Sequence, residues 1–209
     1  QCVVYFKNEA GFESLSSWLT TGYQHPKRVD QPYLTLSGLL TLSADDLIVL
    51  AIPYTHSAGQ WANDQYELYP EMVQCFNQVH EHFKSNFYLG VRRLGIPDET
   101  LVNELMVDYA HKQDVPLVAI NSVCFLNQQD ARAHDARVCI DRGTVLSEKD
   151  KFFQYHPSQY YKTPADMMAL FKEMPEAIHN TVLIAKRLNY QLHFDRRFLP
   201  HFPLPKDLT

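Results

Sequence analysis

The sequence lacks the features that would place it in a membrane, secreted or duplex-binding class. No apolar stretch approaches the roughly twenty residues that a membrane-spanning helix needs, and the first residues carry no basic segment typical of a signal peptide. The four cysteines are scattered without a Cys-x-x-Cys pair, which favours reduced thiols in a cytoplasmic protein. Basic residues are also scarce, since 19 Lys and Arg face 24 Asp and Glu. Because counterion release drives affinity for nucleic acids, the net charge of −5 argues against a chain that grips a DNA duplex by itself.

Motifs of several enzyme classes are missing too. No Gly-x-Ser-x-Gly supports a hydrolase nucleophile. Gly90 and Gly95 enclose four residues as in a phosphate loop, but Ile96 and Pro97 stand where that loop needs Lys and Ser or Thr. No Asp-x-Asp pair exists to hold two cations on shared carboxylates. We therefore expect no catalytic residue in this chain and no cofactor bound by it.

What the sequence does contain is the pattern of an α/β protein. With 209 residues, 45% of them hydrophobic and 21% charged, the chain can bury one sizeable core. Apolar runs alternate with stripes at helical spacing, and parallel strands need crossover connections that are usually helices. This order favours a parallel α/β sheet or barrel. The predicted strands span 3–6, 47–52, 87–91 and 117–120, and the predicted helices span 11–23, 72–83, 101–109 and 130–140.

The pattern changes after Gly143, where strands give way to a polar loop and two helices. Thr163 followed by Pro164 and Asp166 is typical of a helix start. A second helix is predicted to begin at Pro175. We expect its inward face to consist of Ile178, Val182, Ala185 and Leu188.

Three residues are weak candidates for metal binding. His56 and Cys124 each follow a predicted strand, and functional residues of α/β folds gather at such carboxyl ends. His134 lies on a predicted helix near two aspartates. Each has a more ordinary interpretation, because a lone cysteine is more often a small buried hydrophobe and such a histidine more often caps a helix or joins a salt bridge. We therefore expect no metal site.

Two long segments resemble one protein family. Residues 117–146 read LVAINSVCFLNQQDARAHDARVCIDRGTVL, and residues 155–189 read YHPSQYYKTPADMMALFKEMPEAIHNTVLIAKRLN. Both are similar to the PHP (polymerase and histidinol phosphatase) domain of bacterial, C-family DNA polymerase III alpha subunits, and FLPHFPLP at 198–205 resembles the exit of that domain toward the palm. Residues 11–23 and 87–95 are similar to the family more weakly.

The resemblance implies a fold and a damaged metal site. The expected architecture is a partial PHP-type distorted (β/α) barrel with C-terminal helices leading toward the palm. Residues 1–143 would be the C-terminal part of the barrel and residues 144–209 the helical connection. Ser122 and Cys124 stand where metal-binding members carry Asp and His, Gly90 replaces a Glu, and Leu94 replaces a His. Losing these groups would remove most of the charge that holds cations.

The function implied by the resemblance is architectural. The chain would be a fragment of a replicative DNA-directed DNA polymerase, an expectation that the absence of an initiator Met also favours. The parent would elongate primers with magnesium, using palm carboxylates that would lie beyond Thr209. The expected partners are the remainder of the alpha chain, the proofreading exonuclease subunit and, through the parent, replisome subunits and primed DNA, with no membrane. The alternative is an active metal-dependent phosphoesterase or 3′–5′ exonuclease using His56, Cys124 and His134.

Overall fold

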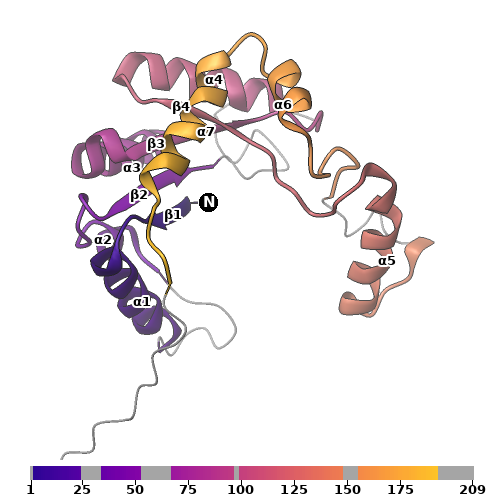
Figure 1. Cartoon of the computed structure of the whole chain (residues 1–209), viewed down its shortest axis with the longest axis horizontal. Helices are drawn as coiled ribbons and strands as arrows, with labels where there is room; N and C mark the ends of the chain where they lie inside the picture. The colour runs from indigo at the N-terminus through magenta and orange to yellow at the C-terminus, as the bar shows by residue number, and fades with distance from the viewer. Residues whose placement is uncertain (1, 25–33, 53–66, 97–98, 148–154, 193–209) are drawn as a thin grey trace, which may run out of the picture.

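The computed structural model describes residues 2–24, 34–52, 67–96, 99–147 and 155–192, and within these ranges four strands form one open sheet (Figure 1). Their order is β1-β2-β3-β4. The strands are β1 (Cys2–Phe6), β2 (Leu47–Ala51), β3 (Phe87–Arg92) and β4 (Leu117–Ile120). All four predicted strands are confirmed, as is the mixed α/β class. The described strands do not close into a barrel, because β1 and β4 lie at opposite edges of the sheet.

β1 departs from the expected parallel order. It pairs antiparallel with β2, whereas β2, β3 and β4 run parallel to one another. The reason is a pair of contacts across the chain, because the Lys7 amide donates to the carbonyl of Asp46 and the Asn8 side chain donates to the Asp46 carboxylate. These bonds hold the end of β1 beside the start of β2, so the intervening chain returns to the same end of the sheet. Antiparallel edge strands on parallel sheets are common.

The central strands are buried on both faces, as their continuous apolar runs predict. Helices α3 (Pro70–Phe83) and α4 (Glu99–Gln113) cover one face, where Phe76, Val79 and Met106 pack with Val49 and Leu89. Helix α7 (Pro175–Arg187) covers the other face, where Ile184 packs on Ile48, Leu50, Tyr88 and Val118. Neighbouring residues of a strand thus belong to different cores, as the alternation of side chains in a strand requires.

The first and fifth helices begin or end at residues that stabilise their termini. Helix α1 (Glu9–Tyr23) starts after Asn8, whose side chain accepts from the Gly11 amide at 2.9 Å. Helix α5 (Ala131–Arg142) stops at Gly143, whose φ of 64° is the left-handed conformation that glycine adopts readily. Both agree with the predicted helices. The short helix α2 (Leu36–Leu39), which the sequence did not reveal, is capped by Thr35.

Short 3-10 turns precede β3 and α5, at Lys84–Asn86 and Gln128–Asp130. Figure 1 shows α5 standing well apart from the sheet, at the opposite side of the molecule from α1. Helix α6 (Pro164–Leu170) has the predicted capping box, in which Thr163 and Asp166 satisfy each other's backbone amides. No helix of the described ranges is long and apolar enough to cross a bilayer.

The predicted inward face of α7 is correct for Ile178 and Leu188, which pack against the cores, and wrong for Val182 and Ala185. Val182 is 47% exposed and Ala185 is also exposed, whereas Ala177 and Ile184 are buried. Two polar anchors set this rotation. Asn180 donates to the carbonyl of Leu117 in β4 at 2.7 Å, and Arg187 donates to the hydroxyl of Tyr88 in β3 at 2.9 Å. Apolar spacing alone allowed two neighbouring faces, and these tertiary bonds select one of them.

Candidate functional site at the carboxyl ends of the strands

The carboxyl ends of β3 and β4 lie at the same end of the sheet. A segment that is distant in the sequence crosses them. Residues 92–95 are the last residue of β3 and the turn that follows it, and residues 121–125 continue β4. Residues 156–162 lie against both, since Tyr160 forms a parallel β-bridge with Phe125 and the Cys124 amide donates to the carbonyl of Gln159. We call these three segments the rim. In open α/β sheets, ligands bind outside the carboxyl ends of the strands, so the rim is the natural candidate site.

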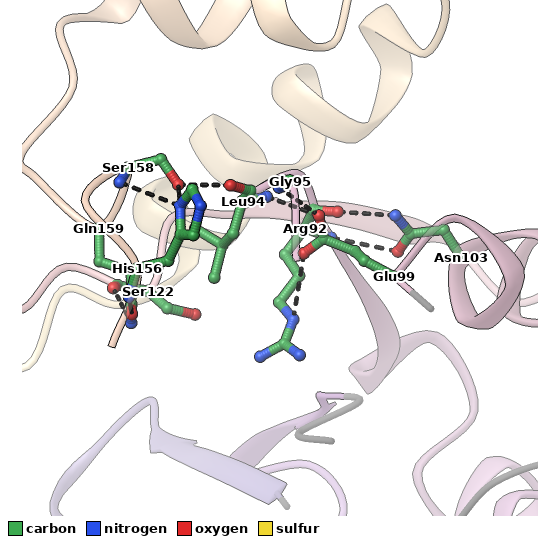
Figure 2. A network of polar contacts seen from close by, with 9 residues as sticks. All are labelled: Arg92, Leu94, Gly95, Glu99, Asn103, Ser122, His156, Ser158 and Gln159. Carbon is green, nitrogen blue, oxygen red and sulfur yellow. Dashed lines mark hydrogen bonds and ion pairs between the residues drawn. The ribbon is translucent and has the colours of Figure 1, made fainter. Parts of the chain in front are cut away.

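A buried carboxylate, Glu99 at the start of α4, organises one half of the rim (Figure 2). Its Oε2 accepts from the amides of Leu94 at 2.7 Å and Gly95 at 2.9 Å. Its Oε1 lies 3.5 Å from Nε of Arg92 and accepts no hydrogen bond from the described residues. Asn103, one turn along α4, donates to the carbonyl of Arg92 at 2.7 Å. The carboxylate therefore holds the turn after β3 against the first turn of α4.

Ser158 ties the crossing segment to the end of β3. Its hydroxyl donates to the carbonyl of Leu94 at 2.5 Å, and Nδ1 of His156 lies 2.6 Å from the same hydroxyl oxygen (Figure 2). A carbonyl can only accept, so the single hydroxyl proton points to Leu94. The backbone amide of Ser158 donates to the same Nδ1 at 3.2 Å, so the imidazole contacts both the amide and the hydroxyl of Ser158.

Gln159 and Lys162 tie the crossing segment to the end of β4. The Gln159 amide group donates to the carbonyl of Ser122 at 3.1 Å and to Sγ of Cys124 at 3.3 Å. The Lys162 ammonium donates to Oδ1 of Asn121 at 3.3 Å and to the carbonyl of Ser158. Burial lowers the pKa of Lys162, against the opposing effect of the Asp166 and Glu99 carboxylates. The polar atoms of the rim are thus largely occupied by one another.

A groove of about 1000 Å³ begins at the rim and runs along α4. Leu94, Leu170 and Met174 contribute apolar surface to it, and Arg93 and Lys162 contribute positive charge. Arg93 is tied down by Glu173, whose carboxylate lies 2.8 Å from its Nη1, and by the carbonyl of Leu170. The wall formed by α4 consists of Thr100, Asn103, Glu104, Val107, Asp108 and His111.

Comparison with known proteins shows what the chain is similar to. No protein-family model matches it. It is 32% identical over 200 residues to the DNA polymerase III subunit alpha of Vibrio cholerae and 34% identical over 197 residues to that of Haemophilus influenzae, in each case over 94% of this chain. The subunit of Pseudomonas fluorescens is 39% identical over 127 residues, which cover 61% of this chain and 11% of the relative. The chain is homologous to one segment of the DNA polymerase III alpha subunit.

The homology covers nearly the whole chain but only a small part of each relative. The chain spans 17% of the length of the Vibrio and Haemophilus alpha subunits. The resemblance to the alpha subunit, read from the two long segments at 117–146 and 155–189, is therefore confirmed. Those segments supply β4, the crossing part of the rim and α7.

The four positions at which the resemblance implies lost metal-binding groups lie at or beside the rim. Gly90 is buried in β3, and a Cβ there would overlap Cδ1 of Ile120 and lie 3.1 Å from its Cγ1. The side chain of Leu94 is 5% exposed, so an apolar group fills that place. Ser122 and Cys124 follow β4 and contact Gln159. Burial raises the pKa of the Cys124 thiol, which disfavours the thiolate that binds metal.

The three weak metal candidates do not form a site among the described residues. His56 lies outside them. The part of the chain that the structure describes contains no group of three or more His, Cys, Asp or Glu placed to hold a metal ion. The expected salt bridge or cap for His134 is not what the structure shows. Its ring packs between Phe125 and Tyr155, with centroid distances of 5.6 and 4.5 Å, and its buried Nδ1 has no hydrogen-bond partner among the described residues.

The residues that organise the rim, Glu99, Ser158 and Gln159, were not predicted as site residues. An acid in the first turn of a helix is a recognisable signal, because the helix dipole favours negative charge there. It could have marked Glu99 as a residue that holds the preceding turn. Nothing local marks Ser158 or Gln159, whose partners are 64 and 37 residues away.

Proposed function

We propose that this chain is the PHP-type segment of a replicative DNA polymerase alpha subunit and acts as a scaffold without a metal site of its own. The relatives supply the first half of the proposal, since each is named as a subunit of DNA polymerase III. The observation that carries the second half is the packing of Ile120 over Gly90. Where the family pattern has a metal-binding glutamate, an isoleucine side chain fills the space that such a side chain would need.

The hydrogen bonds of the rim support the same conclusion. A metal or phosphate site needs polar groups that are free to meet the ligand. Here Glu99 is committed to two backbone amides, Ser158 to the Leu94 carbonyl, and Gln159 to the residues after β4. The polar groups at the carboxyl ends of the strands are hydrogen-bonded to other residues of this chain. Such an arrangement suits a rigid support.

We propose further that the parent polypeptide elongates primed DNA, with magnesium held by palm carboxylates beyond this chain. Residues 144–209 would connect a partial barrel, residues 1–143, to that palm. The scaffold would pack against the remainder of the alpha chain and dock the proofreading exonuclease subunit. The net charge of −5 supports this division of labour, because DNA phosphates would be contacted elsewhere in the parent.

Metal analysis tests the missing site. The purified chain is equilibrated with zinc or manganese, freed of unbound metal, and assayed for bound metal and for hydrolysis of single-stranded DNA. We expect substoichiometric metal and no hydrolysis. Stoichiometric metal with nuclease activity, both lost in Cys124→Ala and His134→Ala, would establish the phosphoesterase alternative instead.

Binding of the exonuclease tests the docking role separately. The proofreading exonuclease subunit of Vibrio cholerae is titrated against this chain, with the complete Vibrio alpha subunit as the positive control. We expect both to bind. Binding to the complete subunit alone would remove docking from the proposal and leave the scaffold role in place.

A further inference from the structure

Strand β1 leaves one edge of the sheet without a partner strand among the described residues, because the order is β1-β2-β3-β4. The Lys7 amide donates to the carbonyl of Asp46, the residue opposite it when the register of β1 and β2 is continued by one position. In an antiparallel pair, residues that bond to the neighbouring strand alternate with residues that do not. The N–H and C=O groups of Cys2, Val4 and Phe6 therefore point away from β2. They form the free edge.

The two edges of the sheet are treated differently by the chain. At β4, Asn180 of α7 donates to the carbonyl of Leu117. In the described part of the chain, no side chain from another element bonds to the backbone of β1 in this way. The sequence of β1, Cys-Val-Val-Tyr-Phe, contains no charge and no proline, and its register with β2 contains no bulge. Natural proteins use such devices to protect an edge that stays exposed, so β1 has the features of a strand that is paired in the complete protein.

An apolar cavity of about 430 Å³ lies beside the free edge. Its walls include Cys2 and Val4 of β1, Leu15 and Trp18 of α1, and Leu39 of α2. No residue of β2 is among the described residues that line it, so the cavity lies on the side of β1 that is turned away from β2 (Figure 1). Successive side chains of a strand point to opposite faces of a sheet. Alternate side chains of a strand added at the free edge would therefore point toward this cavity.

We propose that the free edge of β1 pairs with an extended strand of the parent alpha polypeptide from outside these 209 residues, with alternate apolar side chains in the cavity. Backbone hydrogen bonds hold the added strand, and the cavity selects its apolar side chains. The chain spans 17% of the length of the Vibrio and Haemophilus alpha subunits, so the parent supplies a partner that is always present. An unprotected edge suits such a permanent partner better than one that dissociates. The inference rests on the part of the proposed function that makes this chain a segment of a longer subunit, and not on the missing metal site.

Amide hydrogen exchange tests the pairing residue by residue. The complete polypeptide encoded by the gene is compared with the 209-residue chain at a concentration where sedimentation shows a monomer. We expect the Val4 and Phe6 amides to exchange about 100-fold more slowly in the complete polypeptide, because an amide bonded within a sheet exchanges only when the structure opens. The Val3 and Tyr5 amides are the matched control, since they bond to β2 in both proteins.

Two results of the exchange experiment would overturn the inference. One is free exchange of the Val4 and Phe6 amides in the complete polypeptide, and the other is a gene that encodes no further residues. If the 209-residue chain does not fold alone, its control amides will also exchange freely, and the complete polypeptide then decides. There the Val4 and Phe6 amides must be as protected as the two control amides.

A photo-crosslink identifies the strand that occupies the edge. Tyr5 is 37% exposed on β1, so Tyr5→p-benzoylphenylalanine places the crosslinker at the edge of the complete polypeptide. Irradiation and mass spectrometry should join position 5 to a segment of the same molecule outside residues 1–209. Tyr23→p-benzoylphenylalanine, at an exposed tyrosine of α1, is the matched control and should not give that product. The inference is wrong if the product is absent, or if position 5 is joined instead to a second copy or only to positions within residues 1–209.

Discussion

Replacing Glu99 should destabilise the protein through the loss of its charge and the loss of its hydrogen-bond acceptor, and two variants separate these effects. Glu99→Gln keeps an oxygen that can accept from the Leu94 and Gly95 amides but removes the negative charge beside Arg92. Glu99→Ala removes the acceptor as well and leaves two amides without their carboxylate. Both side chains of the ion pair are buried, at 6% and 8% exposure, so solvent cannot replace what is lost.

The sizes follow from the bonds that each variant loses. Hydrogen bonds to charged groups contribute about 1.5–3 kcal/mol, and neutral ones contribute about 1 kcal/mol. Glu99→Gln exchanges two hydrogen bonds to a charged group for two neutral ones, so we expect a loss of about 1–4 kcal/mol in the free energy of unfolding. Glu99→Ala should cost about 3–5 kcal/mol, the range for removing one member of a buried pair.

Urea denaturation followed by circular dichroism measures both losses. The control is Glu104, a glutamate on the same helix that is exposed and makes no ion pair with a described residue. Glu104→Gln and Glu104→Ala should both stay within about 0.5 kcal/mol of the wild type. A cost below about 1 kcal/mol for Glu99→Ala, or equal costs for its two variants, would refute this account of the rim.

Three further predictions concern the core, the pH response and a helix terminus. Gly90→Ala should lower the free energy of unfolding by about 1–3 kcal/mol through overpacking. Ile120→Val should recover part of that loss in the double variant, because it removes the overlapping Cδ1. Urea midpoints of the wild type, the two single variants and the double variant measure the coupling. Burial raises the pKa of Tyr109 from 10.0 to about 12, so its neutral phenol contributes stability below pH 10 that is lost as the pH rises through 12. Tyr109→Phe should flatten that alkaline part of the stability profile, and an unchanged profile would contradict the assignment. Thr163→Ala should lower the unfolding free energy by about 0.5–2 kcal/mol through loss of the α6 cap, and a thermal melt equal to the wild type would show that the cap is dispensable.

The sequence predicted those parts of the fold that depend on neighbours along the chain. The apolar runs located all four strands, and the turn at Gly143 and the capping box at Thr163 are where the pattern placed them. Such features are encoded within a few residues, because capping and helical periodicity act over one or two turns. The family was also recognisable from sequence, since long segments keep the order of its motifs.

The candidate site is where prediction from sequence was incomplete. Ser122 and Cys124 were correctly placed after a strand, but the residue that contacts both of them is Gln159. The place where a side chain at position 90 would point is filled by Ile120, a residue of the neighbouring strand. Neither partner could be chosen without the strand register and the path of the crossing segment.

By itself the sequence determined the four described strands, the described α-helices except α2, their order and the similarity to the polymerase alpha subunit. The tertiary structure alone decided the direction of β1, the rotation of α7 and the partners of the rim. These three features depend on hydrogen bonds between residues far apart in the chain. Lys7 bonds to Asp46, and Asn180 bonds to Leu117, which lies 63 positions away. Apolar periodicity shows which residues are buried, but a buried polar group must find a specific partner, and only the folded chain brings that partner within reach.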